Sequence, residues 1–362
     1  MRSLIILFLA VVILSGCSEK KSHLRLNDIQ FVGSHNSYKA QIDPGLMEIL
    51  YQQDSNLAVT LDYAHLPIEE QLNLGMRNLE LDVFHDPEGG RYDHPLGLKV
   101  IENATPFNSE EMQKPGLKVF HVQDIDFRSH HNLFVDALRN IKDWSDMHPD
   151  HVPIVITMNL KDEVIDREDF VVPLPFTRNA LDSVDMEISV TLGLEKLLTP
   201  DDVRGNFSEL EGAILKNGWP LLEDVRGKIL FLLDAGEQIN ELYIEDHPSL
   251  KGRMMFVNVE EGSPEAAFQI LNNPFISFNK IQDLVSKGYM VRTRSDANTI
   301  EARENDYSRW HKARESGAQV ITTDYYVPSI FFPSDYSVGF ESDSVYVLNP
   351  VRGKIESASV DQ

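Results

Sequence analysis

The chain has 362 residues, of which 42% are hydrophobic and 25% are charged, and its formal net charge is −24. This composition is ordinary for a globular protein with a large core and excludes a chain that is disordered throughout. The excess of acidic residues argues against nucleic-acid binding and against attraction to anionic membranes, so a phosphate ligand would need a local basic patch.

The N-terminal segment is predicted to direct export. Arg2 precedes an apolar run over residues 4–14, which is shorter than the ~20 residues that span a bilayer. The segment Leu14-Ser15-Gly16-Cys17 resembles the bacterial lipobox, which implies cleavage before Cys17 and acylation of its sulfur. Cys17 is the only cysteine, so an intrachain disulfide is excluded. An uncleaved anchor, or an ordinary signal with an incidental cysteine, is the alternative.

Lipidation would anchor the protein in the cell envelope. Ser18 after Cys17 resembles the outer-membrane sorting signal of Gram-negative cells, so we expect an anchor at the outer membrane or the periplasmic face if the cell is Gram-negative. Loss of residues 1–16 as a lipoprotein signal peptide removes Arg2 and no acidic residue, which takes the net charge from −24 to −25.

Beyond a lipidated tether over residues 17–26, apolar runs with the character of buried strands alternate with helical patterns. Three of the predicted helices end before a glycine, as helices commonly do. We predict helices at residues 66–74, 132–144, 278–286 and 303–316. We predict eight strands, at residues 29–33, 78–83, 117–122, 153–159, 228–234, 254–259, 289–293 and 319–323.

The alternation of strand and helix favours a parallel α/β fold. Eight strands favour a closed (β/α)8 TIM barrel, with a doubly wound sheet as the alternative. Two long connections, 84–116 and 160–227, are predicted to be elaborated loops over the site and not a second domain. The barrel is expected over residues 27–340, with residues 341–362 as a C-terminal tail.

Polar side chains lie at the ends of three predicted strands. His35 and Asn36 follow the first strand, Glu80 and Asp82 end the second, and His121 ends the third. Because the carboxyl ends of parallel strands share one rim of a barrel, these groups should converge there. Two imidazoles can accept and donate a proton, so His35 and His121 are the candidate catalytic base and acid.

Glu80 and Asp82 are two residues apart on one strand, so their side chains point to the same face. Carboxylates are not buried without a partner, and a cation between them would supply one. With the Asn36 amide oxygen they offer the oxygen ligands that Ca²⁺ or Mg²⁺ prefers. A structural ion pair with Arg77 or Arg91 is the alternative.

Arg292 and Arg294 also share one face, at the end of the seventh predicted strand. Planar guanidinium groups are suited to bidentate phosphate binding, and Lys161, beyond the fourth strand, could complete a basic patch. Salt bridges that hold the barrel together are the alternative.

Together these residues resemble the catalytic core of the calcium-dependent phosphoinositide-specific phospholipases C. The resemblance rests on the His35-Asn36 pair, Glu80-x-Asp82 and His121, and it spans about residues 27 to 330. It continues through Arg226-Gly227-Lys228-Ile229-Leu230-Phe231, Gly252-Arg253, Gly262-Ser263-Pro264, Val291-Arg292-Thr293-Arg294 and Gly317-Ala318-Gln319-Val320-Ile321-Thr322-Thr323-Asp324-Tyr325-Tyr326.

The resemblance implies an eight-stranded α/β barrel that cleaves a phosphodiester by acid-base catalysis. The inositol 2-hydroxyl would attack phosphorus with His35 as base or transition-state partner and His121 as its complement. Diacylglycerol would leave, and a cyclic inositol phosphate would form first. Calcium on Asn36, Glu80 and Asp82 would lower the pKa of the hydroxyl and neutralise charge on the phosphoryl oxygens.

The resemblance implies two further candidate site residues. Tyr326 joins Lys161, Arg292 and Arg294 as a substrate-binding candidate. Asn159 stands where the family usually has a metal-ligating glutamate. An amide oxygen can still bind calcium, but the site loses one negative charge, so weaker metal affinity is predicted. A different metal, a different substrate or a lost activity would also explain the change.

Other activities remain open on the sequence. A glycerophosphodiester phosphodiesterase has a similar barrel and a Glu-x-Asp metal pair, but it usually begins with His-Arg-Gly, whereas this chain has His35-Asn36-Ser37. A glycosidase would place its two carboxylates on either side of a sugar bond. A lipid-tethered protein that binds phosphorylated ligands without turnover is the alternative from another class. The expected partners are a phospholipid or other phosphodiester and a membrane, but not nucleic acid.

Overall fold

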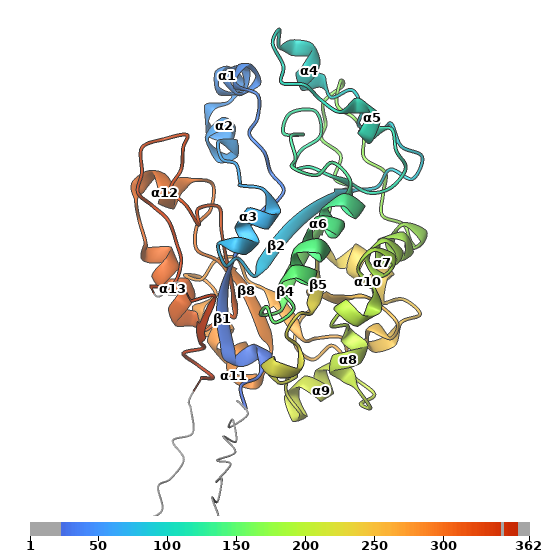
Figure 1. Ribbon diagram of the computed structural model, residues 1–362, viewed down its shortest axis with the longest axis vertical. Coiled ribbons are helices and arrows are strands. Elements are labelled where there is room, and N and C mark those ends of the chain that lie inside the picture. Colours follow the sequence, from blue (N-terminus) through green and yellow to red (C-terminus); the bar gives the residue numbers. More distant parts are fainter. Residues whose placement is uncertain (1–22, 342–343, 354–362) are drawn as a thin grey trace, which may run out of the picture.

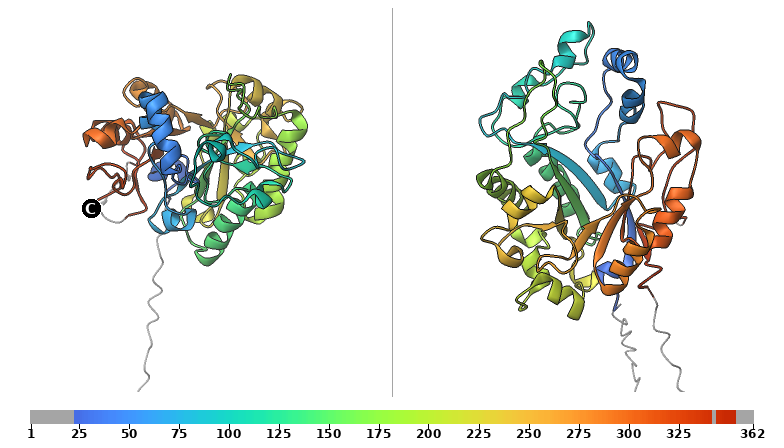
Figure 2. Two further views of the ribbon diagram at one scale, coloured as in Figure 1. Left: turned by 90° about the horizontal axis from the view of Figure 1, so that it is seen from above. Right: turned by 180° about the vertical axis from the view of Figure 1, so that it is seen from behind.

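Eight parallel strands form a nearly closed barrel surrounded by helices (Figures 1 and 2). The computed structural model describes residues 23–341 and 344–353. The predicted α/β barrel is therefore confirmed. The barrel strands are paired in the order β6-β5-β4-β2-β1-β9-β8-β7, and a single bridge between Asn258 and Phe268 joins the two outer strands. Their bounds are β1 (Ile29–Ser34), β2 (Asn78–Phe84), β4 (Ile154–Leu160), β5 (Ile229–Asp234), β6 (Met255–Val257), β7 (Phe268–Ile270), β8 (Met290–Arg294) and β9 (Val320–Thr323).

Strands β1 and β2 are buried along their whole length. One face packs against the helices and the other fills the barrel interior, and the two strands bury polar side chains as well as apolar ones, among them Gln30, Glu80 and Asp82. The two strands pair only at Gly33 and Asn78. A Cβ atom on Gly33 would lie 2.3 Å from the Cβ of Asn78, so only glycine allows this close approach.

The prediction of a barrel strand at residues 117–122 is wrong. Lys118–Val119 forms a two-residue strand, β3, that pairs antiparallel with the end of β2, and it lies outside the barrel. The eighth barrel strand is instead β7, which sequence reasoning missed. Three residues are too few to show a period. The apolar run at 117–120 is buried all the same, because Val119 packs in the main core.

The helices lie outside the barrel and over its rim (Figure 1). Three of the predicted helices correspond to α3, α6 and α11, and the predicted helix at 303–316 is divided into α12 and α13 by Asn305, whose φ is 53°. Gly288 and Gly317 end α11 and α13 in the left-handed conformation, as predicted. The helices are α1 (Pro44–Gln53), α2 (Ser55–Leu61), α3 (Ile68–Asn73), α4 (Leu96–Val100), α5 (Ser109–Met112), α6 (Phe134–Met147), α7 (Arg178–Leu192), α8 (Pro200–Arg204), α9 (Leu210–Lys216), α10 (Glu237–Ile244), α11 (Phe278–Lys287), α12 (Ile300–Glu304) and α13 (Ser308–Ser316).

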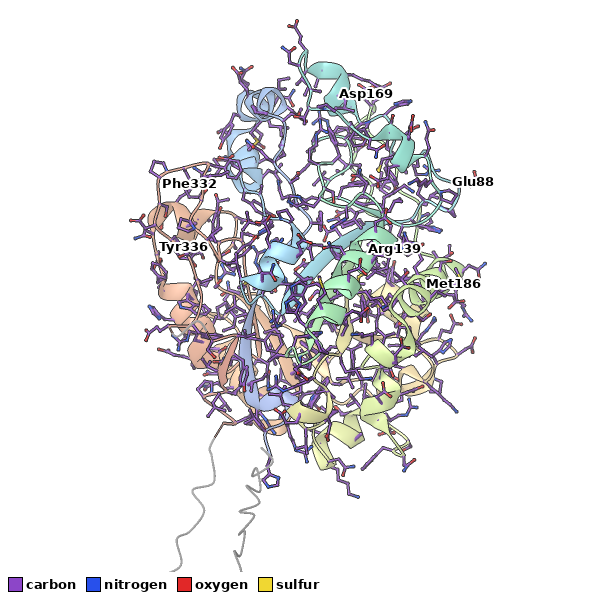
Figure 3. All side chains as sticks on the ribbon, in the orientation of Figure 1. Glu88, Arg139, Asp169, Met186, Phe332 and Tyr336 are labelled. Atoms are coloured by element: carbon purple, nitrogen blue, oxygen red, sulfur yellow. The ribbon has the colours of Figure 1, made fainter. Side chains whose placement is uncertain are left out.

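The two long connections differ from each other. Residues 84–116 carry only α4 and α5 and project beyond the rim, whereas the connection 160–227 contains α7, α8 and α9. The second connection is therefore an elaborated loop only before α7, and the prediction of a loop over its whole length is wrong. Figure 3 shows Glu88 and Asp169, one from each connection, near α4 and α5.

The folded body extends past the boundaries expected from sequence. The backbone N–H of Leu222 donates to the carbonyl of Leu24, and Leu26 is fully buried. At the other end β10 (Tyr346–Leu348) pairs antiparallel with β1, within the segment predicted to be a tail. In the part of the chain that the structure describes, no helix is long and apolar enough to cross a membrane. Cys17 lies outside the described residues.

Candidate active site

The carboxyl ends of four barrel strands bring most of the predicted site residues to one rim, where α1, α2 and α4 project (Figure 1). In the register of the sheet, Asp82 pairs with Asn159, and Asn159 pairs with Asp234 on the next strand. The site residues come from four places: His35 and Asn36 after β1, Glu80 and Asp82 on β2, Asn159 on β4, and Arg292 and Arg294 on β8.

His35 is held as a neutral imidazole with a defined tautomer. Its Nδ1 lies 2.8 Å from Oδ1 of Asp324, and its Nε2 lies 3.1 Å from Nη1 of Arg294. Because arginine only donates hydrogen bonds, Nε2 must accept, and Nδ1 carries the proton that is donated to Asp324. Burial lowers the pKa of His35, and the charge of Arg294 lowers it further. The lone pair on Nε2 is therefore the basic site.

Asp324 is the carboxylate that fixes this tautomer. Burial opposes its ionisation, but His35 and Arg294 hold its pKa well below the usual range. Arg294 Nη2 donates to Asp324 Oδ2 at 2.9 Å. Sequence reasoning did not select Asp324 as a site residue, although it follows the last barrel strand in the same way that His35 follows the first.

His121, like His35, has an aspartate on Nδ1, but the cation beside that aspartate is a lysine and not an arginine. Its Nδ1 lies 2.7 Å from Oδ2 of Asp126, five residues later in the same loop. Asp126 also forms an ion pair with Lys39. Burial opposes ionisation of Asp126, but Lys39 and the hydrogen bond from His121 lower its pKa. Because β3 pairs with the carboxyl end of β2, His121 still lies on the rim side of the barrel.

Basic side chains pair with the rim carboxylates. Arg292 Nη2 binds Oε2 of Glu80, and Arg292 Nη1 lies 3.5 Å from Oδ2 of Asp234. Lys161 Nζ lies 3.4 Å from Oδ2 of Asp82. The predicted phosphate-binding groups are thus brought together with the predicted metal ligands. The alternative partner Arg77 instead donates to backbone carbonyls of α3 and Met76.

The rim carries oxygen donors of the type that calcium prefers. Oδ1 of Asp82 is buried and has no hydrogen-bond partner, and such an oxygen needs a cation or water to offset its desolvation. Among residues 23–341 and 344–353, no three His, Cys, Asp or Glu side chains form a cluster able to hold a metal ion. A calcium site here therefore needs the amide oxygens of Asn36 and Asn159 beside Glu80 and Asp82.

Asn36 adopts a left-handed backbone conformation, with a φ of 50°, which asparagine tolerates better than most residues. Its Nδ2 donates to the hydroxyl of Tyr63 at 2.8 Å. This bond fixes the orientation of the amide, and Oδ1 keeps only a long hydrogen bond of 3.4 Å from Tyr38. The amide oxygen is thus the group available to a ligand.

Tyr326 is placed differently from the other substrate-binding candidates. Its hydroxyl accepts a hydrogen bond from the backbone N–H of Leu66, and its ring stacks on His65 at 5.6 Å between centroids. It lines a small cavity of about 100 Å³ together with His65 and Asp324. The structure therefore places Tyr326 beside His65, in a cavity that Asp324 also lines.

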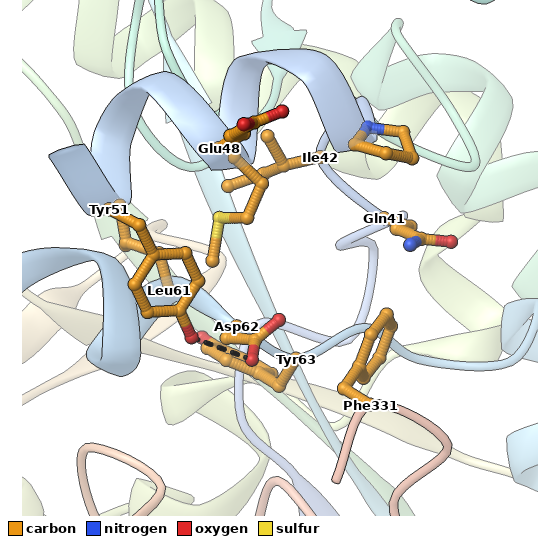
Figure 4. A pocket seen from close by; sticks show the side chains of 10 residues that line it. Gln41, Ile42, Glu48, Tyr51, Leu61, Asp62, Tyr63 and Phe331 are labelled. Atoms are coloured by element: carbon orange, nitrogen blue, oxygen red, sulfur yellow. Dashed lines mark hydrogen bonds between the residues drawn. The ribbon is translucent and has the colours of Figure 1, made fainter. Parts of the chain in front are cut away.

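A second cavity adjoins the site on the side of α1 (Figure 4). Its volume is about 360 Å³, and the Tyr51 hydroxyl donates to Asp62 at its edge over 2.9 Å. Tyr63 lines this cavity and also binds Asn36, so the cavity and the site share one side chain. The apolar part of the lining is formed by Ile42, Pro44, Met47, Leu61 and Phe331.

His65 is a buried imidazole whose two ring nitrogens have no hydrogen-bond partner. Its Nε2 lies 3.9 Å from Oδ1 of Asp324. Burial lowers the pKa of His65 from 6.5 to about 4. The unfolded chain therefore binds a proton at this residue below pH 6.5, whereas the folded protein binds it only below about pH 4.

The His65→Phe variant is expected to lose less stability in acid. In the parent, protonation of His65 in the unfolded chain has no effect on the free energy of unfolding above pH 6.5. Between pH 6.5 and about 4 it lowers that free energy by about 3 kcal/mol. The measurement is the free energy of unfolding by urea from pH 8 to 4. The matched control is His94→Phe, since the His94 side chain is 73% exposed. Parallel pH profiles for the parent and His65→Phe would contradict the prediction.

The chain matches a family model described as phosphoinositide phospholipase C, Ca²⁺-dependent, over residues 24–350. No sequence among curated proteins matches it. Among solved structures, it is similar to a calcium-dependent phosphoinositol-specific phospholipase C from a Gram-negative Pseudomonas species, in crystal form 1 of its apo form. The TM-score is 0.52 and the identity 16%, covering 90% of this chain and 95% of that one.

A second similar structure is a Ca²⁺-dependent phosphatidylinositol-specific phospholipase C from Streptomyces antibioticus, with a TM-score of 0.50 and 16% identity. The match covers 84% of this chain and 95% of that one. At such low identity the structural likeness supports the fold alone, so the family assignment rests on the sequence match.

Proposed function

Because the chain belongs to the calcium-dependent phosphoinositide phospholipase C family, whose members are phosphodiesterases, we propose that it cleaves phosphatidylinositol-type lipids into diacylglycerol and a cyclic inositol phosphate. The observation that carries this proposal is the pair of histidine–aspartate contacts, His35 with Asp324 and His121 with Asp126, on the rim that also holds the carboxylates. A general base and a general acid are what transfer of a phosphoryl group from a lipid to an internal hydroxyl requires.

His35 takes the proton of the attacking 2-hydroxyl on Nε2. Asp324 holds the opposite nitrogen and stabilises the imidazolium that forms. His121 donates a proton to the leaving glycerol oxygen, with Asp126 holding its Nδ1. These roles supply a base on one side of the phosphorus and an acid on the other.

Arg294 must move or share its hydrogen bonds for this step to begin, because its Nη1 caps the lone pair of His35 Nε2. A phosphoryl oxygen is a stronger acceptor for a guanidinium than a neutral imidazole is. Substrate binding thus draws Arg294 towards the phosphate and frees the base. Arg292 and Lys161 are the other cations within reach of the rim.

Asn36, Glu80, Asp82 and Asn159 would hold Ca²⁺, which when bound lowers the pKa of a coordinated hydroxyl and offsets charge on phosphoryl oxygens. Asp234, which pairs with Asn159 in the sheet, brings a carboxylate next to the position that lacks one. Sequence reasoning missed Asp234 because it ends a strand with no second polar residue on the same face.

The proposed lipid anchor on Cys17 would sit at the end of the barrel opposite the site. The described chain begins beside the start of β1, at the end of the molecule farthest from α1 and α4 (Figure 1). The seven residue steps from Cys17 to Leu24 span about 25 Å at most when fully extended.

We expect the purified chain to release inositol phosphate from phosphatidylinositol in mixed micelles when Ca²⁺ is present and not when chelator is added. Phosphorus NMR of the product identifies the cyclic ester. Glycerophosphoinositol, tested in parallel, distinguishes a glycerophosphodiester phosphodiesterase. Binding of phosphatidylinositol without turnover of any of these phosphodiesters would instead indicate a lipid-binding protein.

A further inference from the structure

His121 lies on an excursion that leaves the barrel, so its position depends on contacts and not on a barrel strand. The excursion enters through the two-residue strand β3 and closes in a tight turn, in which the N–H of Val122 and the carbonyl of Asp126 bond at 3.0 Å. A loop attached in this way needs an anchor on the rim to hold a side chain in place for catalysis.

Several contacts anchor this loop, such as the ion pair of Arg128 with Asp43 at 2.8 Å, and Lys39 is the anchor that acts on the aspartate partner of His121. Its side chain is fully buried, and its Nζ lies 3.1 Å from Oδ1 of Asp126, which is also fully buried. Lys39 follows β1 by a few residues, and its backbone pairs with Ser129 beyond Asp126. The barrel segment that carries His35 is thus joined to the loop that carries His121 by a buried ion pair.

The same ammonium group also contacts the other half of the site. It lies 4.8 Å from the ring centroid of Tyr63, whose hydroxyl binds the Asn36 amide and whose ring stacks on His35. Each histidine therefore has an aspartate on Nδ1 and a cation on the far oxygen of that aspartate. For His35 the cation is Arg294, and for His121 it is Lys39.

The two cations differ in one respect that decides their roles. Arg294 touches the ring of His35 and is partly exposed at the rim, where it can reach a phosphate. Lys39 is sealed from solvent and has neither ring nitrogen of His121 as a partner in the described contacts. Its contacts with the groups of the site run through Asp126 and Tyr63.

We propose that Lys39 is a positioning residue that orients His121 through Asp126 and balances the charge of that carboxylate. The inference rests on the proposed role of His121 as general acid. The positive charge of Lys39 weakens the hold of Asp126 on the Nδ1 proton of His121. The imidazolium can therefore give its Nε2 proton to the leaving group. Lys39 also holds the Asp126 carboxylate, whose other oxygen lies 2.7 Å from Nδ1 of His121.

A purely structural ion pair is the competing explanation, and the chain offers a matched control for it. Lys118 is equally buried and pairs with Asp86 at 3.2 Å, on the same excursion, and its Nζ also donates to the carbonyls of Lys114 and Gly116, so its partners among the described residues do not include Asp126 or His121. Breaking either pair leaves a buried carboxylate without its cation and should lower stability to a similar extent. Only the Lys39 pair should change the behaviour of His121.

The test compares Lys39→Met with Lys118→Met in the full-length chain in mild detergent. A misplaced acid costs about 10²-fold, so we expect Lys39→Met to lower kcat by that order with KM nearly unchanged. The pKa of His121, followed by NMR of ¹³C-labelled histidine, should rise, because the Asp126 charge is no longer balanced. Lys118→Met should leave kcat and the pKa of His121 unchanged.

If Lys39→Met alone does not fold, the double variant Lys39→Met with Asp126→Asn takes its place. The double variant removes both charges of the pair and so buries no unbalanced charge. If Lys39 acts through Asp126, the removal of Lys39 should cost no further kcat once Asp126 has been replaced, so this variant should not be slower than Asp126→Asn alone. An additional loss, or an unchanged pKa of His121 in Lys39→Met, would overturn the inference. The NMR measurement needs no substrate, so it stands even if phosphatidylinositol is not cleaved.

Discussion

Replacing His35 or His121 by alanine is expected to lower kcat by about 10²–10⁴-fold each, with little change in KM. Both imidazoles act on protons that move only in the transition state, whereas substrate is bound mainly by the cations of the rim. The measurement is steady-state release of inositol phosphate from phosphatidylinositol in the presence of Ca²⁺. The double variant should be little worse than either single variant, because both residues act in the same phosphoryl-transfer step, one on the attacking oxygen and one on the leaving oxygen.

Control variants separate this effect from damage to the fold. His94→Ala removes an imidazole whose side chain is 73% exposed and should leave kcat unchanged. His35→Ala also leaves Asp324 without its imidazole partner, so its unfolding transition is measured beside that of the parent. Retention of more than a tenth of the parent kcat in a folded His121→Ala would remove His121 from the general-acid role.

The Asp82→Asn variant is expected to weaken Ca²⁺ binding by about 100-fold, which corresponds to ~2.8 kcal/mol. The substitution keeps the shape of the side chain and removes one negative charge from a group whose Oδ1 is buried and unpartnered. Isothermal titration with Ca²⁺ measures the effect without reference to activity. The matched control is Asp283→Asn, which removes the same charge from an exposed position on α11.

Two further variants test the charge balance of the same site. Asn159→Asp restores the carboxylate missing from the rim and should tighten Ca²⁺ binding by about tenfold, or ~1.4 kcal/mol. Asp234→Asn should weaken binding if that carboxylate compensates for Asn159, its neighbour in the sheet. Tight binding by the parent that neither Asp82→Asn nor Asn159→Asp alters would show that calcium binds elsewhere.

Local patterns in the sequence predicted the architecture. Long buried strands such as β4 and β5 are mostly apolar, and the helices α11 and α13 end at glycines, so the alternation of a parallel barrel was readable. The one misplaced strand shows the limit of such patterns. Residues 117–120 and the short strand β7 are both buried, and burial alone does not say which of them pairs in the barrel.

The residues of the candidate site were likewise only partly predictable from the sequence. Residues within two positions of one another on a strand, such as Glu80 and Asp82, could be selected from spacing, because a strand turns alternate side chains to one face. The partners Asp324, Asp126 and Lys39 could not. The contacts of Asp324 with His35 and of Asp126 with Lys39 join residues 289 and 87 positions apart, respectively, and no local pattern reports a contact at that separation.

The sequence by itself therefore determined the fold class, the family resemblance and the chemical types that gather at the rim, because these follow from periodicity and short motifs. Only the tertiary structure decided which cation faces which carboxylate, that His121 stands on an excursion outside the barrel, and that a buried lysine supports it. The reason is physical: hydrogen bonds and ion pairs depend on distances of a few ångströms between segments that only the closed barrel brings together.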